Sequence, residues 1–198
     1  MPKTERREQL LDAAASIIVE RGLAGITMER LAATAGVSKA LPYAHFENAD
    51  EVLAELYRRE ITQLGAAIVA RVASADHGID RLVAAMRAYF DFVEARGAIL
   101  TVLAGAGSSP AEASDPDIGP NFVADLLVDS LGISRARAVP LAGVVLGALL
   151  GATSMWGRGV VSRKTAEASV IDFVVAGVTA VTHDSKARPR SGPRKNAG

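Results

Sequence analysis

Apolar residues recur at intervals of three and four along almost the whole chain, which is the period of an α-helix rather than of a β-strand. The first such stripe ends before Gly22. It comprises Leu10, Leu11, Ala14, Ile17 and Ile18. No segment alternates polar and apolar residues as a half-buried strand does, and no internal repeat is found. The sequence therefore predicts an all-α fold of about nine helices.

Glycines and capping residues place the ends of these helices. Thr27 and Gly36 bracket a helix of two turns, Ser38 begins the next helix, and Asn48 begins a long one. The predicted helices cover residues 4–21, 28–35, 39–46, 48–72, 79–97, 98–104, 121–131, 135–157 and 165–182. Gly, Ser, Pro and Asp accumulate over residues 105–120, so a long mobile loop is expected there.

Composition narrows the chemistry that the chain can perform. Hydrophobic residues make up 49% of the 198 residues, which suits a globular protein, and there is no Cys. The three histidines lie far apart, so neither a metal site nor a bound cofactor is expected. The helices after residue 78 contain no His and few acidic residues on their apolar faces, so an enzyme is not expected. The charged N-terminus lacks the apolar core of a secretory signal, which favours a cytoplasmic protein.

Charge is distributed unevenly, although the formal net charge is zero. Residues 1–46 have a net charge of +1, residues 47–182 of −5, and residues 183–198 of +4. The bulk of the chain therefore lacks the broad basic surface of many nucleic-acid-binding proteins. Any contact with DNA must be local and made by the first segment.

The segment from Thr27 to Phe46 contains two short predicted helices around Gly36, Val37 and Ser38, which is the pattern of a helix-turn-helix. In such a motif the second helix enters the major groove of DNA, while hydroxyl groups and helix N-termini hold phosphates. The same pattern also occurs as plain core packing, so the motif alone leaves both interpretations open.

The surroundings of this motif are more specific. The run from Gly22 to Lys39, followed by Tyr43, His45 and Phe46, resembles the N-terminal DNA-binding domain of the TetR family of transcriptional regulators. The resemblance covers residues 4 to about 60. It implies a homodimer that binds double-stranded DNA at a palindromic operator and represses transcription until a small molecule releases it. A constitutive DNA-binding regulator with no effector is the alternative.

Three regions are expected along the chain. Residues 1–47 would form the helix-turn-helix domain, and residues 48–182 would form a helical domain for effector binding and dimerisation, joined through the long fourth helix. Residues 183–198 are basic, contain two prolines and have no apolar stripe, so a disordered tail is expected.

Seven residues are expected to contact DNA by their position in this resemblance: Thr27, Ser38, Lys39, Ala40, Leu41, Tyr43 and His45. Lys39 can hold a phosphate or a guanine, whereas Ala40 and Leu41 offer only apolar contact. Thr27, Tyr43 and His45 would hold phosphates. Packing against the core is the alternative for Tyr43 and His45.

Two positions depart from the family pattern. Residues 40–42 read Ala-Leu-Pro where Gly-Thr-Leu is usual, and Pro42 removes a backbone donor, so the recognition helix is expected to start distorted. Ala49 stands where a lysine usually begins the fourth helix, which removes one phosphate contact per subunit. The tail could replace that contact, although solubilisation is its alternative role. Its cations are Arg188, Arg190, Arg194 and Lys195.

Residues 138–157 are uncharged over 20 positions, which is long enough to cross a membrane. A membrane span is not expected, because Pro140 and Thr153 interrupt the segment and no second one exists. Two predicted helices each carry small or β-branched apolar residues at every fourth position, and these two faces suggest a homodimer interface. Packing inside the chain is the alternative. These faces comprise Gly143, Gly147, Gly151, Val170, Val174 and Val178.

Large apolar side chains on several of the later helices could surround a cavity for an effector, although ordinary core packing is the alternative. The candidates are Met86, Tyr89, Phe90, Leu103, Phe122, Met155 and Trp156. Few polar residues interrupt this set, so the expected effector is a hydrophobic small molecule that is uncharged or weakly polar. Its binding is expected to displace the fourth helix and thereby the recognition helix.

Overall fold

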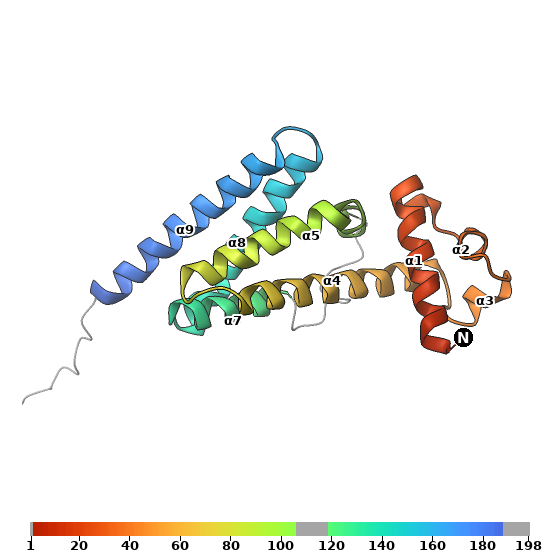
Figure 1. The fold of residues 1–198 in the computed structure, drawn as a ribbon, viewed down its shortest axis with the longest axis horizontal. Helices are drawn as coiled ribbons and strands as arrows, with labels where there is room; N and C mark the ends of the chain where they lie inside the picture. Colours follow the sequence, from red (N-terminus) through yellow and green to blue (C-terminus); the bar gives the residue numbers. More distant parts are fainter. Residues whose placement is uncertain (1, 106–118, 188–198) are drawn as a thin grey trace, which may run out of the picture.

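The computed structural model describes residues 2–105 and 119–187, and Figure 1 shows that this part of the chain is built from helices. Within these ranges there are eight α-helices, one single-turn helix and no strand. The elements are α1 (Lys3–Arg21), η1 (Leu23–Gly25), α2 (Met28–Ala35), α3 (Ala40–Tyr43), α4 (Ala49–Ala73), α5 (Ile79–Gly105), α7 (Pro120–Leu131), α8 (Arg135–Gly157) and α9 (Arg163–Ala187). The predicted all-α fold is confirmed.

The N-terminal unit packs α1, α2, α3 and the start of α4 around one apolar core. All members of this core are almost completely buried; they include Leu10 and Ile17 of α1, Leu31 of α2, Phe46 from the segment between α3 and α4, and Leu56 of α4. The apolar stripe that the sequence shows along α1 is therefore the face that α1 turns toward α2 and α4.

Side-chain caps start the second and fourth helices where the sequence places them. The Thr27 hydroxyl accepts a hydrogen bond from the Arg30 backbone N–H at 3.1 Å, and Asn48 Oδ1 accepts one from the Glu51 N–H at 2.9 Å. Gly36 ends α2 in the left-handed conformation, with φ of +66°, which glycine adopts without steric cost. These caps fix the turn between α2 and α3.

The long helix α4 leads from the N-terminal unit into a second unit, where it lies beside α5 (Figure 1). There α5, α7, α8 and α9 enclose a second core, which contains Leu82, Phe90, Leu127, Leu149 and Val174. One helix thus reaches from the end of the helix-turn-helix to the wall of the second unit.

The separate helix expected over residues 98–104 is wrong, because α5 continues through Gly97 to Gly105. A Cβ at position 97 would lie 2.7 Å from Cγ1 of Val93, so this glycine makes room for a neighbouring turn rather than ending the helix. Ile99 is buried in the first core, and its burial stabilises the continuation of α5.

Two expected segments lie wholly or partly outside the described residues. Residues 106–118 of the expected loop are among them, as are residues 188–198 with the four cations of the tail. The last helix, by contrast, is longer than expected, because α9 extends to Ala187 rather than ending at residue 182.

Replacing Thr27 by Ala should lower the free energy of unfolding by about 1 kcal/mol, because the first turn of α2 loses its side-chain acceptor. Thr27→Ser keeps the hydroxyl and should stay within about 0.5 kcal/mol of the wild type. Urea unfolding followed by circular dichroism measures both. Equal losses in the two variants would contradict a capping role.

Candidate nucleic-acid interface and effector cavity

The residues expected to contact DNA lie at the N-cap of α2, in the turn before α3, on α3 and just after it, at one end of the molecule and away from α7 (Figure 1). Five of them are exposed: Thr27, Ser38, Lys39, Ala40 and Tyr43. Leu41 and His45 are half-buried. The surface that they form contains hydroxyl groups, one lysine and small apolar side chains.

Pro42 shortens the candidate recognition helix, and α3 spans only residues 40–43. Because Pro42 has no N–H, the Ser38 carbonyl accepts a hydrogen bond from the Leu41 N–H instead, at 3.0 Å, in a tighter turn. Helical bonding resumes when the Ala44 N–H donates to the Ala40 carbonyl at 3.2 Å. The prediction that Ser38 caps this helix is wrong, since the helix begins at Ala40 without a side-chain cap.

Tyr43 and His45 have different environments. The Tyr43 side chain is 55% exposed, which leaves its hydroxyl free to meet a phosphate and argues against a role in the core. Burial lowers the pKa of His45, and the positive charges of Lys3, Arg7 and Arg6 lower it further. The His45 imidazole is therefore neutral near pH 7, and its buried Nδ1 has no hydrogen-bond partner among the described residues.

Arg7 on α1 holds the end of the helix-turn-helix against α4. Its guanidinium lies over the Phe46 ring, 4.6 Å from the centroid, and Nη1 donates to the His45 carbonyl at 3.1 Å. The same guanidinium pairs with Glu55 of α4 at 3.3 Å. Sequence reasoning missed this role, because the sequence of the charged N-terminus does not show which distant side chains Arg7 contacts.

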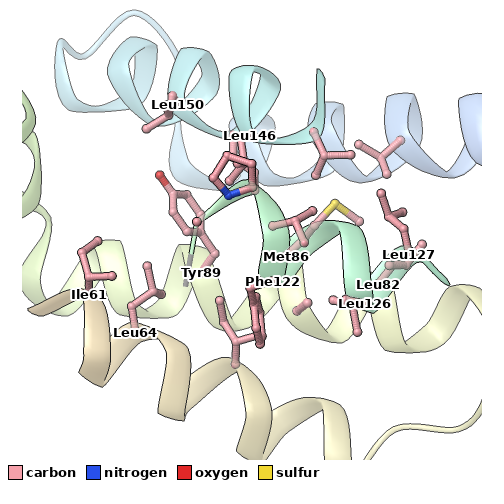
Figure 2. A pocket seen from close by; sticks show the side chains of 18 of the residues that line it. Ile61, Leu64, Leu82, Met86, Tyr89, Phe122, Leu126, Leu127, Leu146 and Leu150 are labelled. Carbon is pink, nitrogen blue, oxygen red and sulfur yellow. The ribbon is translucent and has the colours of Figure 1, made fainter. Parts of the chain in front are cut away.

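An apolar cavity of about 290 Å³ lies in the second unit, between α4, α5, α7 and α8, with one contact from α9. Three of the expected residues line it, namely Met86, Tyr89 and Phe122, and Figure 2 shows their side chains around it. The grouping of α5 and α7 side chains around a cavity therefore agrees with the sequence analysis at these positions.

The other residues expected at the cavity do not line it. Phe90 is fully buried, and its ring packs against that of Trp156 with centroids 6.4 Å apart, so both belong to the core behind Tyr89. Met155 is 39% exposed on α8. Leu103 lies in α5, but its side chain is outside the described residues.

Sequence reasoning missed the cavity wall formed by α4. Tyr57, Ile61, Leu64 and Ile68 line it, at spacings of four, three and four residues that place them on one helix face. That stripe is visible in the sequence and could have indicated that α4 itself contacts the ligand. The α8 wall was also missed; it comprises Val145, Leu146, Leu149 and Leu150.

Among the residues that the structure describes, no charged side chain lines the cavity. Its polar side-chain groups are the hydroxyls of Tyr57 and Tyr89. Burial raises the pKa of Tyr89, and a hydrogen bond with Thr153 opposes this shift only in part, so the Tyr89 hydroxyl stays protonated at neutral pH. The cavity can therefore take an apolar body and offer a neutral hydrogen bond, and it offers no counter-charge.

Of the two faces expected to form a dimer interface, the one on α8 is exposed to solvent and the one on α9 is buried within the chain. Gly143, Gly147 and Gly151 are exposed along α8, with no atom within 4 Å of a Cβ built at any of them. The expectation for Val170, Val174 and Val178 is wrong, because these residues are buried in the core of the chain. Their spacing of four residues marks the inner face of α9, whereas Phe173 of the same helix is 61% exposed.

The helix α8 is long and apolar enough to cross a membrane by length and composition, and no other helix in the described residues is. Only 17% of its most apolar window is buried within the chain. This helix therefore exposes an apolar surface, which includes Val144.

Residues 10–56 match the family model for bacterial regulatory proteins of the tetR family. Over this segment the chain is similar to the tetR family of bacterial regulatory proteins. The match begins in α1 and ends in α4, so it contains the whole helix-turn-helix and the residues after α3 that Arg7 contacts, His45 and Phe46.

Curated relatives from this family are similar over the same half of the chain. The transcriptional activator FasR of Mycolicibacterium smegmatis is 36% identical over 94 residues, which are 48% of this chain and 43% of FasR. The transcriptional repressor KstR2 of Rhodococcus jostii is 32% identical over 106 residues, which are 46% of this chain and 52% of KstR2. The chain thus matches about half the length of these relatives, which are regulators rather than enzymes.

A solved structure shows that the fold extends beyond this half. The transcriptional regulator FadR from Bacillus subtilis, in complex with stearoyl-CoA, has a TM-score of 0.72 over 86% of this chain and 98% of its own. At 17% sequence identity this likeness establishes the fold. The second unit is therefore arranged as in a solved bacterial regulator.

The lowered pKa of His45 predicts that the difference in stability between the wild type and a variant without this histidine depends on pH. The unfolded chain binds a proton near pH 6.5 more readily than the folded chain does, so His45 costs the folded state stability as the pH falls below that value. His45→Gln removes this loss, and His77 and His183 are common to both proteins. The urea midpoint of the wild type relative to His45→Gln should be higher at pH 8 than at pH 5.5. A difference independent of pH would contradict the assigned shift.

Proposed function

We propose that this chain is a cytoplasmic transcriptional repressor that binds a palindromic operator in double-stranded DNA as a homodimer and is released by a hydrophobic small molecule. The observation on which the effector proposal rests is the uncharged cavity of about 290 Å³, one wall of which is α4. The same helix contributes Leu56 to the core of the helix-turn-helix unit. A ligand in the cavity thus contacts the element that supports the DNA-binding surface.

The DNA contact is supported by the exposed groups on α2 and α3. Thr27 caps α2, whose first-turn N–H groups favour a phosphate, and the exposed Tyr43 hydroxyl and Lys39 ammonium add two donors. Ala40 is exposed and Leu41 is half-buried, and they give apolar contacts such as those with thymine methyl groups. Base readout through hydrogen bonds is therefore limited, and shape and phosphate contacts supply much of the affinity.

The dimer proposal is supported by the outer face of α8. The exposed glycines Gly143, Gly147 and Gly151 let another backbone approach closely, and Val144 next to them is an exposed apolar residue. A second copy of the same face would cover this surface and remove it from water.

Effector release requires a change in the spacing of the two recognition helices. In a dimer they must match major grooves about 34–36 Å apart. A ligand that fills the cavity displaces α4 and with it the helix-turn-helix of each subunit. To weaken operator binding 100-fold, the ligand must favour the released conformation by about 2.7 kcal/mol.

A neutral straight-chain probe tests the effector proposal. We expect 1-decanol to raise the melting temperature and to weaken binding to a duplex selected from a random pool. We expect decanoate to do neither, because none of the described residues lining the cavity carries a counter-charge. At 100 times its dissociation constant a ligand adds about 2.7 kcal/mol of stability, a shift of a few degrees. Thermal shift and fluorescence anisotropy measure the two effects.

Leu146→Phe, which fills part of the cavity, is the matching variant, and Val160→Phe on the exposed surface is its control. Only Leu146→Phe should lose the response to 1-decanol. Stabilisation by 1-decanol without any loss of DNA binding would instead support the constitutive regulator.

The dimer proposal predicts that Gly147→Glu gives a monomer of 20.6 kDa in light scattering, because two buried carboxylates would face each other across the interface. Ala70→Glu, on the exposed side of α4, introduces the same charge and should leave the dimer intact. A dimeric Gly147→Glu variant would place the interface elsewhere.

A further inference from the structure

Glu60 is the one charged side chain that is fully buried among the described residues, with 0% exposure. It lies on α4, close to the junction between the two units. A buried carboxylate is costly unless cations compensate it, so its partners constrain how the surrounding helices can be arranged.

Two arginines from different helices compensate Glu60. Arg59 Nη2, also on α4, donates to Oε1 at 3.2 Å, and Arg96 Nε on α5 lies 3.3 Å from Oε2. The Arg96 contact is an ion pair without hydrogen-bond geometry. Glu60 Oε2 therefore has no hydrogen-bond partner among the described residues. The link to α5 is thus the weaker of the two.

Arg59 connects the same carboxylate to the N-terminal unit. Its Nη1 donates to Asp12 at 2.8 Å and to Glu8 at 3.2 Å, and both acceptors lie on α1. Arg96 in turn donates to Gln63 of α4 at 2.9 Å. A continuous series of charged contacts therefore runs from α1 through Glu60 to α5.

This series lies beside the cavity. Tyr57, Ile61 and Leu64 line the cavity, and Glu60 lies between them in the sequence, one residue before Ile61. A ligand that shifts these three side chains must also move the Glu60 backbone relative to α5.

We infer that Glu60 is the positioning residue that transmits occupancy of the cavity to α1. When the cavity is filled, Glu60 loses its contact with Arg96 of α5 and relies on its contact with Arg59, which binds Asp12 and Glu8 of α1. The inference rests on the proposed effector function. When α4 moves away from α5, the Glu60–Arg96 pair lengthens, and the buried charge must be compensated by Arg59. Arg59 then changes its contacts with Asp12 and Glu8, which moves α1 and the helix-turn-helix packed on it.

Glu60→Gln tests this role, because it removes the charge and keeps the size of the side chain. The control is Glu94→Gln, which removes the charge of an exposed α5 residue that pairs with Arg163. The first readout is the ratio of DNA dissociation constants with and without 1-decanol. The second is the change that 1-decanol causes in amide hydrogen exchange of α1, which a purely structural role would not alter.

In the wild type and in Glu94→Gln, 1-decanol should slow exchange around the cavity and change exchange in α1. In Glu60→Gln, 1-decanol should still slow exchange around the cavity but should no longer change exchange in α1. The ratio of the DNA dissociation constants with and without 1-decanol should fall at least about tenfold. If Glu60→Gln does not fold, Arg96→Gln makes the same test, because Glu60 then keeps its bond to Arg59.

The outcomes separate the two proposals. No protection by 1-decanol in the wild type overturns the proposed effector class and this inference with it. Protection of the cavity with an unchanged α1 response in Glu60→Gln, or with no α1 response in the wild type, overturns the inference alone.

Discussion

The arrangement of this protein depends on α4 being packed into both units at once. Near its start, Val52 and Leu56 are buried in the core that also holds Phe46 at the end of the helix-turn-helix. Further along, Ile61 and Leu64 form a wall of the cavity. Because close-packed side chains leave few voids, a helix fixed in this way cannot move at one end without moving neighbours at the other. The fold thus supplies a mechanical connection between the cavity and the candidate DNA-binding surface.

Polar contacts between the same helices restrict how α4 can move relative to α1 and α5. Arg7 lies over Phe46 and pairs with Glu55, so the end of the helix-turn-helix, α1 and α4 meet at a single guanidinium. About one turn further along α4, Arg59 and Glu60 repeat the arrangement between α1 and α5. Apolar packing tolerates small slides, whereas a buried carboxylate requires a cation within reach, so these contacts restrict the conformations that are available.

The side chains that line the cavity and those on the outer face of α8 differ because one side of α8 packs against other helices of the chain and the other side does not. The side of α8 that faces α4 and α5 presents Leu146 and Leu149 to the cavity. Its opposite side presents glycines to solvent, because no other described helix covers it. One apolar helix therefore serves two proposed roles, ligand binding on the inside and association with a second copy on the outside.

The sequence by itself determined the helical class, the caps at Thr27 and Asn48 and the helix-turn-helix, because these depend on local periodicity and on hydrogen bonds between residues a few positions apart. It also identified Met86 and Tyr89 as members of one apolar face. Only the tertiary structure decided what each face meets. Val174 and Gly143 belong to equally smooth stripes, yet one faces the core and the other solvent, since periodicity gives the faces of a helix and not its partners. The same reason explains why Gly97 continues a helix instead of ending it, and why Glu60 is buried, since the arginine that compensates it from α5 lies far along the chain.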